Sequence, residues 1–519
     1  MRWTRAAVVA STLSIVLTGC GAGPSDRPGV AVERPALGNA VQPTTASAAP
    51  KKATVPKTDL AWRDCTTPTL NLLGLGAAPA GLVLECAEYS TPIDTQGTVI
   101  GSFRTGAMRA RLPQTPADAP PLVLTSGTDR SSTATLAGLA VGSGGAGPLT
   151  TRPIVAVDRR GIGTSQPIDC LPAEIRTGLN DNGQFGPDAA KPAEAVSALS
   201  QEATISCRDF LQPYEGLFDA PHAADDIEQL RKQWQVDNID LLGTGNGAKV
   251  ALSYARKFGD HLSRLVLDSP EAVNTDAVTR EEQRMQGAEA ALTAFAQRCK
   301  ATNCSLGADP RAAIADLVGK AGTGGLGDIS AKALLTGITG FLGGPRADQS
   351  NRIAELADAL SAAGRGDRAA LGNLILRESA ATASDGQFVN RCTDIQQPPT
   401  PGKATELAAQ WAQKYPVFGK SAALGLLDCS AWPVPSAAPL PEKLDLSVLV
   451  LNSVADPVKG NGGTPSVTGA LGSAGARHAT VNWQGWGHPV FTHSGCAQRA
   501  LLEYLAEAKL PADGTACPA

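Results

Sequence analysis

Short, predominantly apolar runs bounded by turn formers recur along this chain and limit the folds it can adopt. They occupy residues 121–124, 153–157, 239–242, 264–267 and 447–451. Continuous rather than alternating apolar residues suit strands that are buried on both faces of a parallel sheet. Helical periodicity separates several of the runs, as at residues 223–234 and 248–258. Strands that alternate with helices predict a doubly wound, mostly parallel α/β sheet.

One long region interrupts this alternation. Two further strands are expected to open the sheet, at residues 82–89 and 98–109. Residues 271–440 then lack a clear series of strands and contain helical stretches instead, at residues 279–299, 310–320, 352–363 and 404–415. The strand pattern resumes at residue 444, and a last helix is expected at residues 497–506. We therefore predict a core of residues 58–270 and 441–519, with residues 271–440 as a mostly helical lid.

The N-terminus has the pattern of an export signal. Arg2 and Arg5 precede an apolar run over residues 6–17, which is too short to cross a bilayer but suits a signal peptide. Gly19 stands directly before Cys20, and this resembles the bacterial lipobox. The resemblance implies cleavage before Cys20 and a lipid on its thiol. An ordinary signal peptide with an incidental Cys20 is the alternative.

The residues after the signal predict how the protein is held in place. Residues 21–57 are rich in Pro, Ala, Ser and Thr and lack apolar periodicity, which is typical of a disordered tether. The globular part would then be anchored through Cys20 to the outer face of the bacterial cytoplasmic membrane or the cell envelope. The net charge is −4 and no basic stripe is present, so we expect no nucleic acid partner.

The cysteine content agrees with export. The chain has 11 cysteines, so an even number remains once Cys20 is set aside, as expected in an oxidising compartment. No Cys or His spacing is that of a zinc site, and we expect neither a metal nor a cofactor. Spacing alone leaves several connectivities open. Pairing of neighbours would close local loops and is our prediction: Cys65–Cys86, Cys170–Cys207, Cys299–Cys304, Cys392–Cys429 and Cys496–Cys517.

Residues 239–254 combine a strand, a sharp turn and a helix, which is the context of a Gly-x-Ser-x-Gly nucleophile elbow. Gly243 and Gly247 occupy the two outer positions, and Gly245 stands where the serine would be. A glycine-rich turn could also cradle a phosphate, but this spacing fits neither the dinucleotide fingerprint nor the phosphate-binding loop. Glycine adopts the positive φ of an elbow without the strain that a serine bears. We predict an elbow without its nucleophile.

Two residues further along the chain follow the order in which α/β-hydrolases place their acid and base. Asp456 comes just after the strand at 447–451, and His488 follows a predicted strand at 479–483. An aspartate bonded to a histidine fixes its tautomer and stabilises its positive charge. Asp456 could instead cap a turn before Pro457, and His488 could be an exposed loop residue. Their joint position after two strands favours an acid–base pair.

Motifs outside the elbow carry a family resemblance. Residues 158–165 have the sequence Asp-Arg-Arg-Gly-Ile-Gly-Thr-Ser, residues 429–433 Cys-Ser-Ala-Trp-Pro, and residues 510–518 Leu-Pro-Ala-Asp-Gly-Thr-Ala-Cys-Pro. With Asp456-Pro-Val they resemble secreted bacterial tripeptidyl and prolyl aminopeptidase-like α/β-hydrolases, from about residue 60 to the end. The resemblance implies a serine exopeptidase that trims short peptides from a free N-terminus, with Asp456 and His488 as acid and base.

The departures from that family fall on the chemistry. Gly245 replaces the nucleophilic serine. The loop after the 121–124 strand is of Gly-Gly-Pro-Gly type in the family, where it supplies an oxyanion donor, but here residues 125–130 are Thr-Ser-Gly-Thr-Asp-Arg. Gly127 is the candidate donor in this loop, and the backbone N–H of Asn246 is the other.

No neighbouring hydroxyl is an obvious substitute for the serine. Ser253 lies two turns into the helix, Thr244 should point away from His488, and nothing in the sequence places Ser126 beside His488. Asp394 matches a lid motif that the family associates with the substrate's N-terminus, although a surface carboxylate beside a disulfide is the alternative. The other histidines have no partner motif and are expected at the surface or in the core: His222, His261, His478 and His493.

Three functions remain open. The first, which we favour, is a catalytically impaired family member that binds a peptide or small ligand at the cell envelope. The second is an active hydrolase or exopeptidase that uses another nucleophile or a water activated by His488. The third is a structural envelope lipoprotein without a ligand. We expect a monomer attached to the membrane through Cys20.

Overall fold

The computed structural model describes residues 51–142, 146–345, 348–433 and 437–519. The predicted signal peptide, Cys20 and most of the predicted tether lie outside these ranges. From residue 51 the chain already contacts the core. The carbonyl of Lys51 accepts a hydrogen bond from Arg264 Nη1 (3.0 Å), and the N–H of Lys57 donates to the Trp234 carbonyl (2.9 Å). The last residues of the predicted 21–57 tether are therefore docked on the core.

A single ten-stranded sheet forms the centre of the molecule, in the order β1-β2-β3-β5-β4-β6-β7-β8-β9-β10. The strands β1 to β3 pair antiparallel, β3 meets β5 antiparallel, and β4 to β10 pair in parallel. Their bounds are Arg63–Asp64, Val83–Pro92, Ser102–Arg111, Leu122–Thr125, Ile154–Val157, Ile239–Thr244, Leu262–Asp268, Ser447–Ala455, Arg477–Trp486 and Thr515–Cys517. An antiparallel start followed by a parallel, doubly wound sheet confirms the predicted α/β-hydrolase fold.

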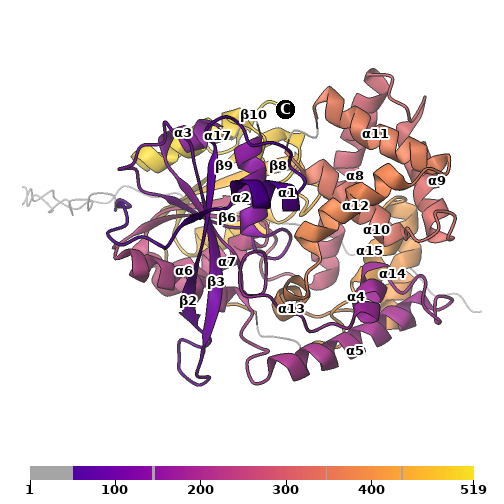
Figure 1. Ribbon diagram of the computed structural model, residues 1–519, viewed down its shortest axis with the longest axis horizontal. Coiled ribbons are helices and arrows are strands. Elements are labelled where there is room, and N and C mark those ends of the chain that lie inside the picture. The colour runs from indigo at the N-terminus through magenta and orange to yellow at the C-terminus, as the bar shows by residue number, and fades with distance from the viewer. Residues whose placement is uncertain (1–50, 143–145, 346–347, 434–436) are drawn as a thin grey trace, which may run out of the picture. The chain divides into compact units, whose positions relative to one another are not determined.

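Helices cover both faces of this sheet, with α2, α3 and α17 on one face and α6 and α7 on the other (Figure 1). Successive strand residues belong to opposite cores, as Leu241 packs with α6 and α7 while Leu242 packs with α2 and α17. This explains why the strands are predominantly apolar runs. The core helices are α1 Thr66–Leu72, α2 Ser132–Val141, α3 Ala146–Thr151, α6 Ala220–Trp234, α7 Gly247–Phe258, α16 Thr464–Ser473 and α17 Gly495–Glu507.

Some strands extend beyond the apolar runs that predicted them. The strand β8 continues from the expected end at residue 451 to Ala455, and its polar Asn452 pairs with Asn482 of β9 through their side-chain amides (3.0 Å). Hydrogen bonding rather than apolar burial holds this last part. A search for apolar residues therefore stops too early.

Eight helices lie between β7 and β8, within the region predicted as the lid (orange at the right of Figure 1). They enclose a hydrophobic core of their own around Phe295, Phe341 and Trp411. Four were expected from the sequence, and α10, α12, α13 and α15 were not. In α10, Gly337 and Gly340 weaken the helical pattern, because glycine disfavours helix. The bounds are α8 Ala277–Ala301, α9 Pro310–Gly322, α10 Ala331–Gly343, α11 Ser350–Gly364, α12 Ala369–Thr382, α13 Asp385–Asp394, α14 Pro401–Lys414 and α15 Gly419–Gly425.

A second segment also joins the lid. The helices α4 (Ala173–Asn180) and α5 (Pro192–Leu211) arise between β5 and β6; α5 packs against α14 and α15, and α4 packs against α5. Lys332 of α10 donates to the Leu179 carbonyl at the end of α4 (2.7 Å). Both helices also share a hydrophobic cluster with Phe103 of β3. The predicted core of residues 58–270 therefore includes two helices that contact the lid.

The five predicted disulfides are all present: Cys65–Cys86, Cys170–Cys207, Cys299–Cys304, Cys392–Cys429 and Cys496–Cys517. Such a number of disulfides indicates an extracellular or periplasmic protein. Within the described ranges, no helix combines the length and the apolar character needed to span a membrane.

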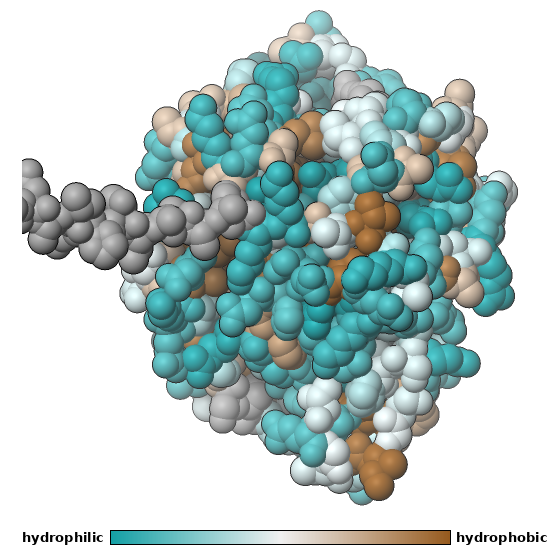
Figure 2. Space-filling view, turned by 90° about the vertical axis from the view of Figure 1, so that its left-hand side faces the viewer, coloured by the Kyte–Doolittle hydropathy of each residue, from teal (hydrophilic) through white to brown (hydrophobic). Residues whose placement is uncertain are grey.

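Hydrophilic residues predominate on the face seen in Figure 2, where apolar residues form small separate groups. The large apolar side chains that are exposed come from different elements, such as Leu72 of α1, Ile205 of α5 and Leu376 of α12. Apolar residues scattered in this way are normal on a soluble surface.

Candidate active site

The elbow has the backbone that the sequence predicts. Gly245 follows β6 with φ of 55°, in the region that glycine adopts without strain. Its N–H donates to the Asp268 carbonyl at the end of β7 (2.9 Å). The neighbouring chain is equally close, since a Cβ on Gly127 would lie only 2.5 Å from the Gly247 nitrogen. Small residues are therefore required where the β4 loop crosses the start of α7.

Asp456 and His488 come together beside the elbow. Asp456 Oδ2 bonds His488 Nδ1 at 2.7 Å, and the exposed fractions of the two side chains are 1% and 9%. Asp456 Oδ1 accepts the N–H groups of Val458 (2.7 Å) and Lys459 (2.8 Å). Asp456 thus caps its own turn and orients the histidine at once, and His488 is not an exposed loop residue. Their catalytic role stays a prediction.

Another carboxylate, that of Asp129, lies close to Gly245. A Cβ built on Gly245 would lie 3.0 Å from His488 Nε2 and 3.1 Å from Asp129 Oδ2. Both groups approach the glycine more closely than an ordinary side chain allows. The site is therefore packed around a glycine and not merely short of one hydroxyl.

Asp129 also faces the predicted oxyanion donor. The N–H of Asn246 points to Asp129 Oδ2 over a long 3.4 Å, and Lys459 Nζ lies 2.8 Å from Asp129 Oδ1. The sequence alone did not predict a role for Asp129. Its position, two residues after the candidate donor Gly127, was the feature that could have indicated one.

The charge on His488 follows from its carboxylate neighbours. Burial alone would lower the pKa of the imidazole, but the attraction and hydrogen bond of Asp456, with Asp129 and Asp268 adding to it, raise that pKa above its ordinary value. These carboxylates therefore stabilise the imidazolium form relative to that of an isolated histidine. Asp268 in turn holds the histidine loop, because its carboxylate accepts the N–H groups of Val490 (2.9 Å) and Phe491 (2.8 Å). Burial raises the pKa of Asp268 to about 6.

A buried ion-pair cluster continues from Asp129 into the lid side of the site. Glu271, just after β7, pairs with Lys459 (2.7 Å) and with Lys249 of α7. Asn246 Nδ2 donates to Glu271 (3.2 Å), and Arg280 of α8 lies 3.7 Å away. Although burial opposes its charge, these cations hold the pKa of Glu271 well below its ordinary value. Asn246 is the one residue of this cluster that was predicted from the sequence to belong to the site.

Asp394 is buried at the end of α13. Its Oδ2 pairs with Arg159 Nη1 (2.6 Å) and its Oδ1 accepts the N–H of Ala220 (3.0 Å). Arg159 also donates to Asn246 Oδ1 (2.9 Å), so the ion pair of Arg159 and Asp394 helps to fix the Asn246 side chain next to Gly245. The surface alternative for Asp394 is wrong, since only 7% of its side chain is exposed. A contact with a substrate's N-terminus stays a prediction.

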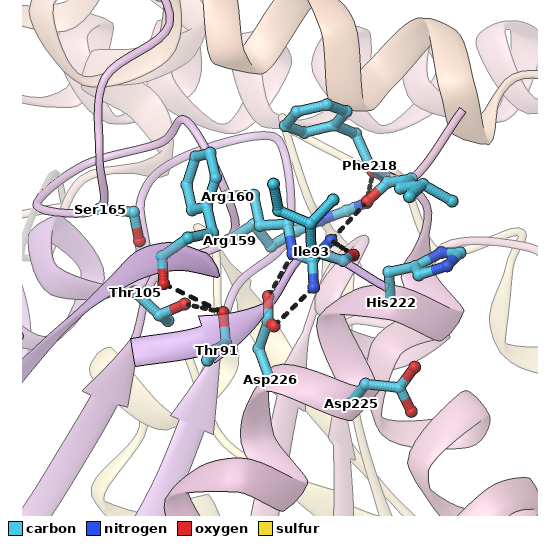
Figure 3. A network of polar contacts seen from close by, with 12 residues as sticks. Thr91, Ile93, Thr105, Arg159, Arg160, Ser165, Phe218, His222, Asp225 and Asp226 are labelled. Carbon is cyan, nitrogen blue, oxygen red and sulfur yellow. Dashed lines mark hydrogen bonds and ion pairs between the residues drawn. The ribbon is translucent and has the colours of Figure 1, made fainter. Parts of the chain in front are cut away.

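Arg159 and Arg160 of the Asp-Arg-Arg-Gly motif take part in a network of polar contacts (Figure 3). Arg160 makes two hydrogen bonds to Asp226 (2.8 and 2.9 Å) and donates to the Ile93 carbonyl (2.6 Å). Arg159 donates to the Phe218 carbonyl (2.6 Å). This network connects the end of β2, the helix α6 and the loop after β5. The two arginines of the motif therefore stabilise the fold around the elbow.

In the described part of the chain, the hydroxyls of Thr244, Ser126 and Ser253 form no hydrogen bond to His488. Thr244 Oγ1 donates to Ser126 Oγ (3.0 Å), so these two hydroxyls bond each other. Ser253 is buried in α7. The remaining histidines lie among local contacts, as His222 pairs with Asp219 and His493 stacks on Trp483.

A cavity of about 830 Å³ opens between the core and the lid. Its lining includes His488, Asn246 and Asp129 from the core side, with residues of α8, α10, α12 and α13 from the lid. Among the described residues, no group of three or more His, Cys, Asp or Glu side chains is arranged to hold a metal ion.

Comparisons with known proteins agree with this fold. Residues 415–517 match the family model of TAP-like proteins, a segment that contains Asp456 and His488. No match was found among curated proteins.

Solved structures resemble the chain only distantly. A bromoperoxidase from Bacillus anthracis is 15% identical over 81% of this chain and 100% of its own, with a TM-score of 0.36. Esterase E22 is 12% identical over 81% of this chain and 100% of its own, with a TM-score of 0.39. Esterase RhEst1 from Rhodococcus sp. ECU1013 is 13% identical over 81% and 99%, with a TM-score of 0.34. At these scores the fold assignment stands on the sheet order itself.

Proposed function

We propose that this chain is an exported lipoprotein of the tripeptidyl-aminopeptidase kind that has lost serine catalysis and binds a peptide or small ligand at the cell envelope. One observation carries the proposal. Gly245 offers no nucleophile, and the Asp129 carboxylate lies beside it against the N–H of Asn246.

The position of Asp129 opposes the chemistry of a serine hydrolase. Such enzymes stabilise a developing oxyanion with N–H donors, and loss of one donor costs about 10²- to 10³-fold in rate. A carboxylate that already faces Asn246 N–H would compete for this donor and repel the oxyanion. The loss of function would then have two independent causes, at the nucleophile and at the oxyanion site.

The protonation state of His488 also affects ligand binding. A general base must accept a proton from its nucleophile, and it does so only in the neutral form. The pKa of His488 is raised, against the effect of burial, by Asp456 and its neighbours. A larger fraction of the protein near neutral pH then holds an imidazolium, which donates hydrogen bonds to a ligand but accepts none.

The cavity supports a binding role. Its volume of about 830 Å³ lies within the range of about 300–1,000 Å³ that is usual for ligand sites. Its lining combines apolar side chains such as Leu335 and Phe418 with charged ones. A structural protein with a collapsed pocket would not keep such a volume.

Restoring the chemistry in two steps tests the proposal. A fluorophosphonate probe, which labels an activated serine whatever the substrate, should not label the wild type or Gly245→Ser. Gly245→Ser combined with Asp129→Ala should be labelled, because removal of the carboxylate frees the N–H of Asn246 to stabilise the oxyanion. Lys459 keeps Glu271 as a partner in this variant, so the fold should persist.

Two controls make the result specific. Asp129→Ala alone should stay unlabelled, and adding His488→Ala to the double variant should abolish labelling. If the wild type cleaves short peptide p-nitroanilides and His488→Ala stops it, another nucleophile is at work and the proposal is wrong.

Attachment to the envelope has a test of its own. Cys20→Ser should move the protein expressed in bacteria from the membrane fraction to the soluble fraction. Retention of the variant in the membrane fraction would contradict the lipid anchor.

A further inference from the structure

The cavity beside His488 differs in charge from the chain as a whole. Ten of its lining residues are Arg or Lys and seven are Asp or Glu, whereas the whole chain has a net charge of −4. Positive charge is thus concentrated at the cavity. Which of these charged side chains already form ion pairs decides what kind of ligand the cavity can bind.

The acidic groups nearest the elbow are already neutralised. Glu271 is paired with both Lys249 and Lys459, and Asp129 with Lys459. Asp394 is held by Arg159 and by a backbone N–H. A ligand ammonium would have to displace one of these buried cations, which leaves that cation unpaired at a high cost. No carboxylate of this group is free to receive a peptide's amino terminus.

Of the three cations beside Glu271, Arg280 has the least compensation. Only 11% of its side chain is exposed, and its nearest acid, Glu271, lies 3.7 Å away and is shared with two lysines. In the described part of the chain, no hydrogen bond involves its guanidinium, which has five N–H donors. Because Arg280 lines the cavity, these donors can meet a ligand there.

The cluster therefore holds three cations, Lys249, Arg280 and Lys459, against the two carboxylates Glu271 and Asp129. A further anion would balance it. The guanidinium fork matches a carboxylate in two parallel hydrogen bonds, which are stronger than neutral ones. The lysines already have partners, so Arg280 is the residue left to form such a contact.

We infer that the ligand presents a carboxylate to Arg280, as the C-terminus of a short peptide would, and that a free amine is not required. The inference rests on the proposed binding function and adds the polarity of the ligand to it. It differs from the expectation of the family resemblance, in which a free N-terminus is recognised.

Two matched peptides test this polarity. N-acetyl-Ala-Ala-Ala carries a carboxylate and no amine, and Ala-Ala-Ala-amide carries an amine and no carboxylate. Titration of the full chain, followed by calorimetry or ligand-detected NMR, should show binding of the acetylated peptide and at least tenfold weaker binding of the amide. Arg280→Gln should weaken binding of the acetylated peptide about 10- to 100-fold.

Matched variants separate recognition from folding. Arg280→Lys keeps the charge but not the fork, and should have an intermediate affinity. Arg365→Gln, in the lid but outside the cavity lining, should bind as the wild type does. Thermal melts would verify that Arg280→Gln is folded.

The outcomes distinguish the inference from the function on which it rests. Preference for the amide, or unchanged binding in a folded Arg280→Gln, would overturn the carboxylate assignment but leave a binding protein. Binding of neither peptide would overturn both for short peptides.

Discussion

The site has an acid–base half, formed by Asp456 and His488, and an elbow half, formed by Gly245 and Asn246. The two halves differ in how closely they match the site of a serine hydrolase. Asp456 and His488 are buried and bonded at 2.7 Å, as a working pair would be. At the elbow, Gly245 offers no hydroxyl and Asp129 lies against Asn246. The TAP-like family match covers residues 415–517 and therefore only the acid–base half. The fold holds the aspartate–histidine pair in place although the elbow carries a glycine.

The reason lies in how each half is built. Asp456 and His488 stand just beyond β8 and β9, and Gly245 stands just beyond β6. The parallel sheet brings these strand ends to one edge whatever residues they carry. Function depends on side chains grafted on that edge, so it can be lost without loss of the fold.

Lys459 connects the two halves, and its removal should have the largest effect on stability. It follows Asp456 in the chain and pairs with both Asp129 and Glu271. Lys459→Met should lower the free energy of unfolding by about 3–5 kcal/mol, because it leaves two buried carboxylates short of a cation. Urea unfolding measures the change.

Lys443→Met provides the control, since Lys443 and its partner Asp445 are both largely exposed. Its effect on the free energy of unfolding should be negligible, because water screens an exposed ion pair. A loss in the free energy of unfolding below about 1 kcal/mol for Lys459→Met would mean that Lys249 and Arg280 are enough to compensate the buried carboxylates. The two halves would then not be linked through Lys459.

The acid–base half should show a pH-dependent stability of intermediate size. Asp456→Asn still accepts the N–H of Val458 but no longer attracts a charged His488. Because the folded pKa of His488 is raised, its stabilisation is present below the ordinary value of 6.5 and is lost as pH rises through the folded value. The variant should lose about 1–3 kcal/mol at pH 6 and less at pH 9.

Unfolding in urea at the two pH values measures this difference. His261→Gln, which removes a histidine outside the cavity lining, serves as the control. A loss that is equal at both pH values would indicate that His488 is neutral throughout, and the elbow would then be the only impaired half.

The smallest effect concerns the space around Gly245. Gly245→Ala and Gly475→Ala both place a Cβ at positive φ, 55° and 75°. At Gly475 nothing lies within 4 Å of the added atom, whereas at Gly245 His488 and Asp129 lie at 3.0 and 3.1 Å. Gly245→Ala should be destabilised by about 1 kcal/mol more than Gly475→Ala, as crowding adds to the backbone strain.

Thermal or urea unfolding of the two variants gives the comparison directly. Adding Asp129→Ala to Gly245→Ala should recover part of the difference. Equal losses at the two glycines would mean that the site has room for a serine, and that only the hydroxyl is missing.

Several features were predictable because they follow local rules. The strands were found where apolar residues are continuous, and the disulfides because neighbouring cysteines close short loops. The helices α10 and α13 were missed. The glycines of α10 obscure its pattern, and α13 is a largely polar helix buried by its surroundings. The contacts of α4 and α5 with the lid helices could not be predicted, since packing partners leave no local trace.

The sequence by itself determined the fold class and the chain order of Gly245, Asp456 and His488. These depend on residue type and chain order, which are written in the sequence directly. Only the tertiary structure decided that Asp129, Glu271, Arg280 and Lys459 form one cluster of charges and that Asp129 lies beside Gly245. Asp129 and Lys459 come from segments far from Glu271 and Arg280, and long-range ion pairs are set by how the sheet and lid pack and not by any local pattern.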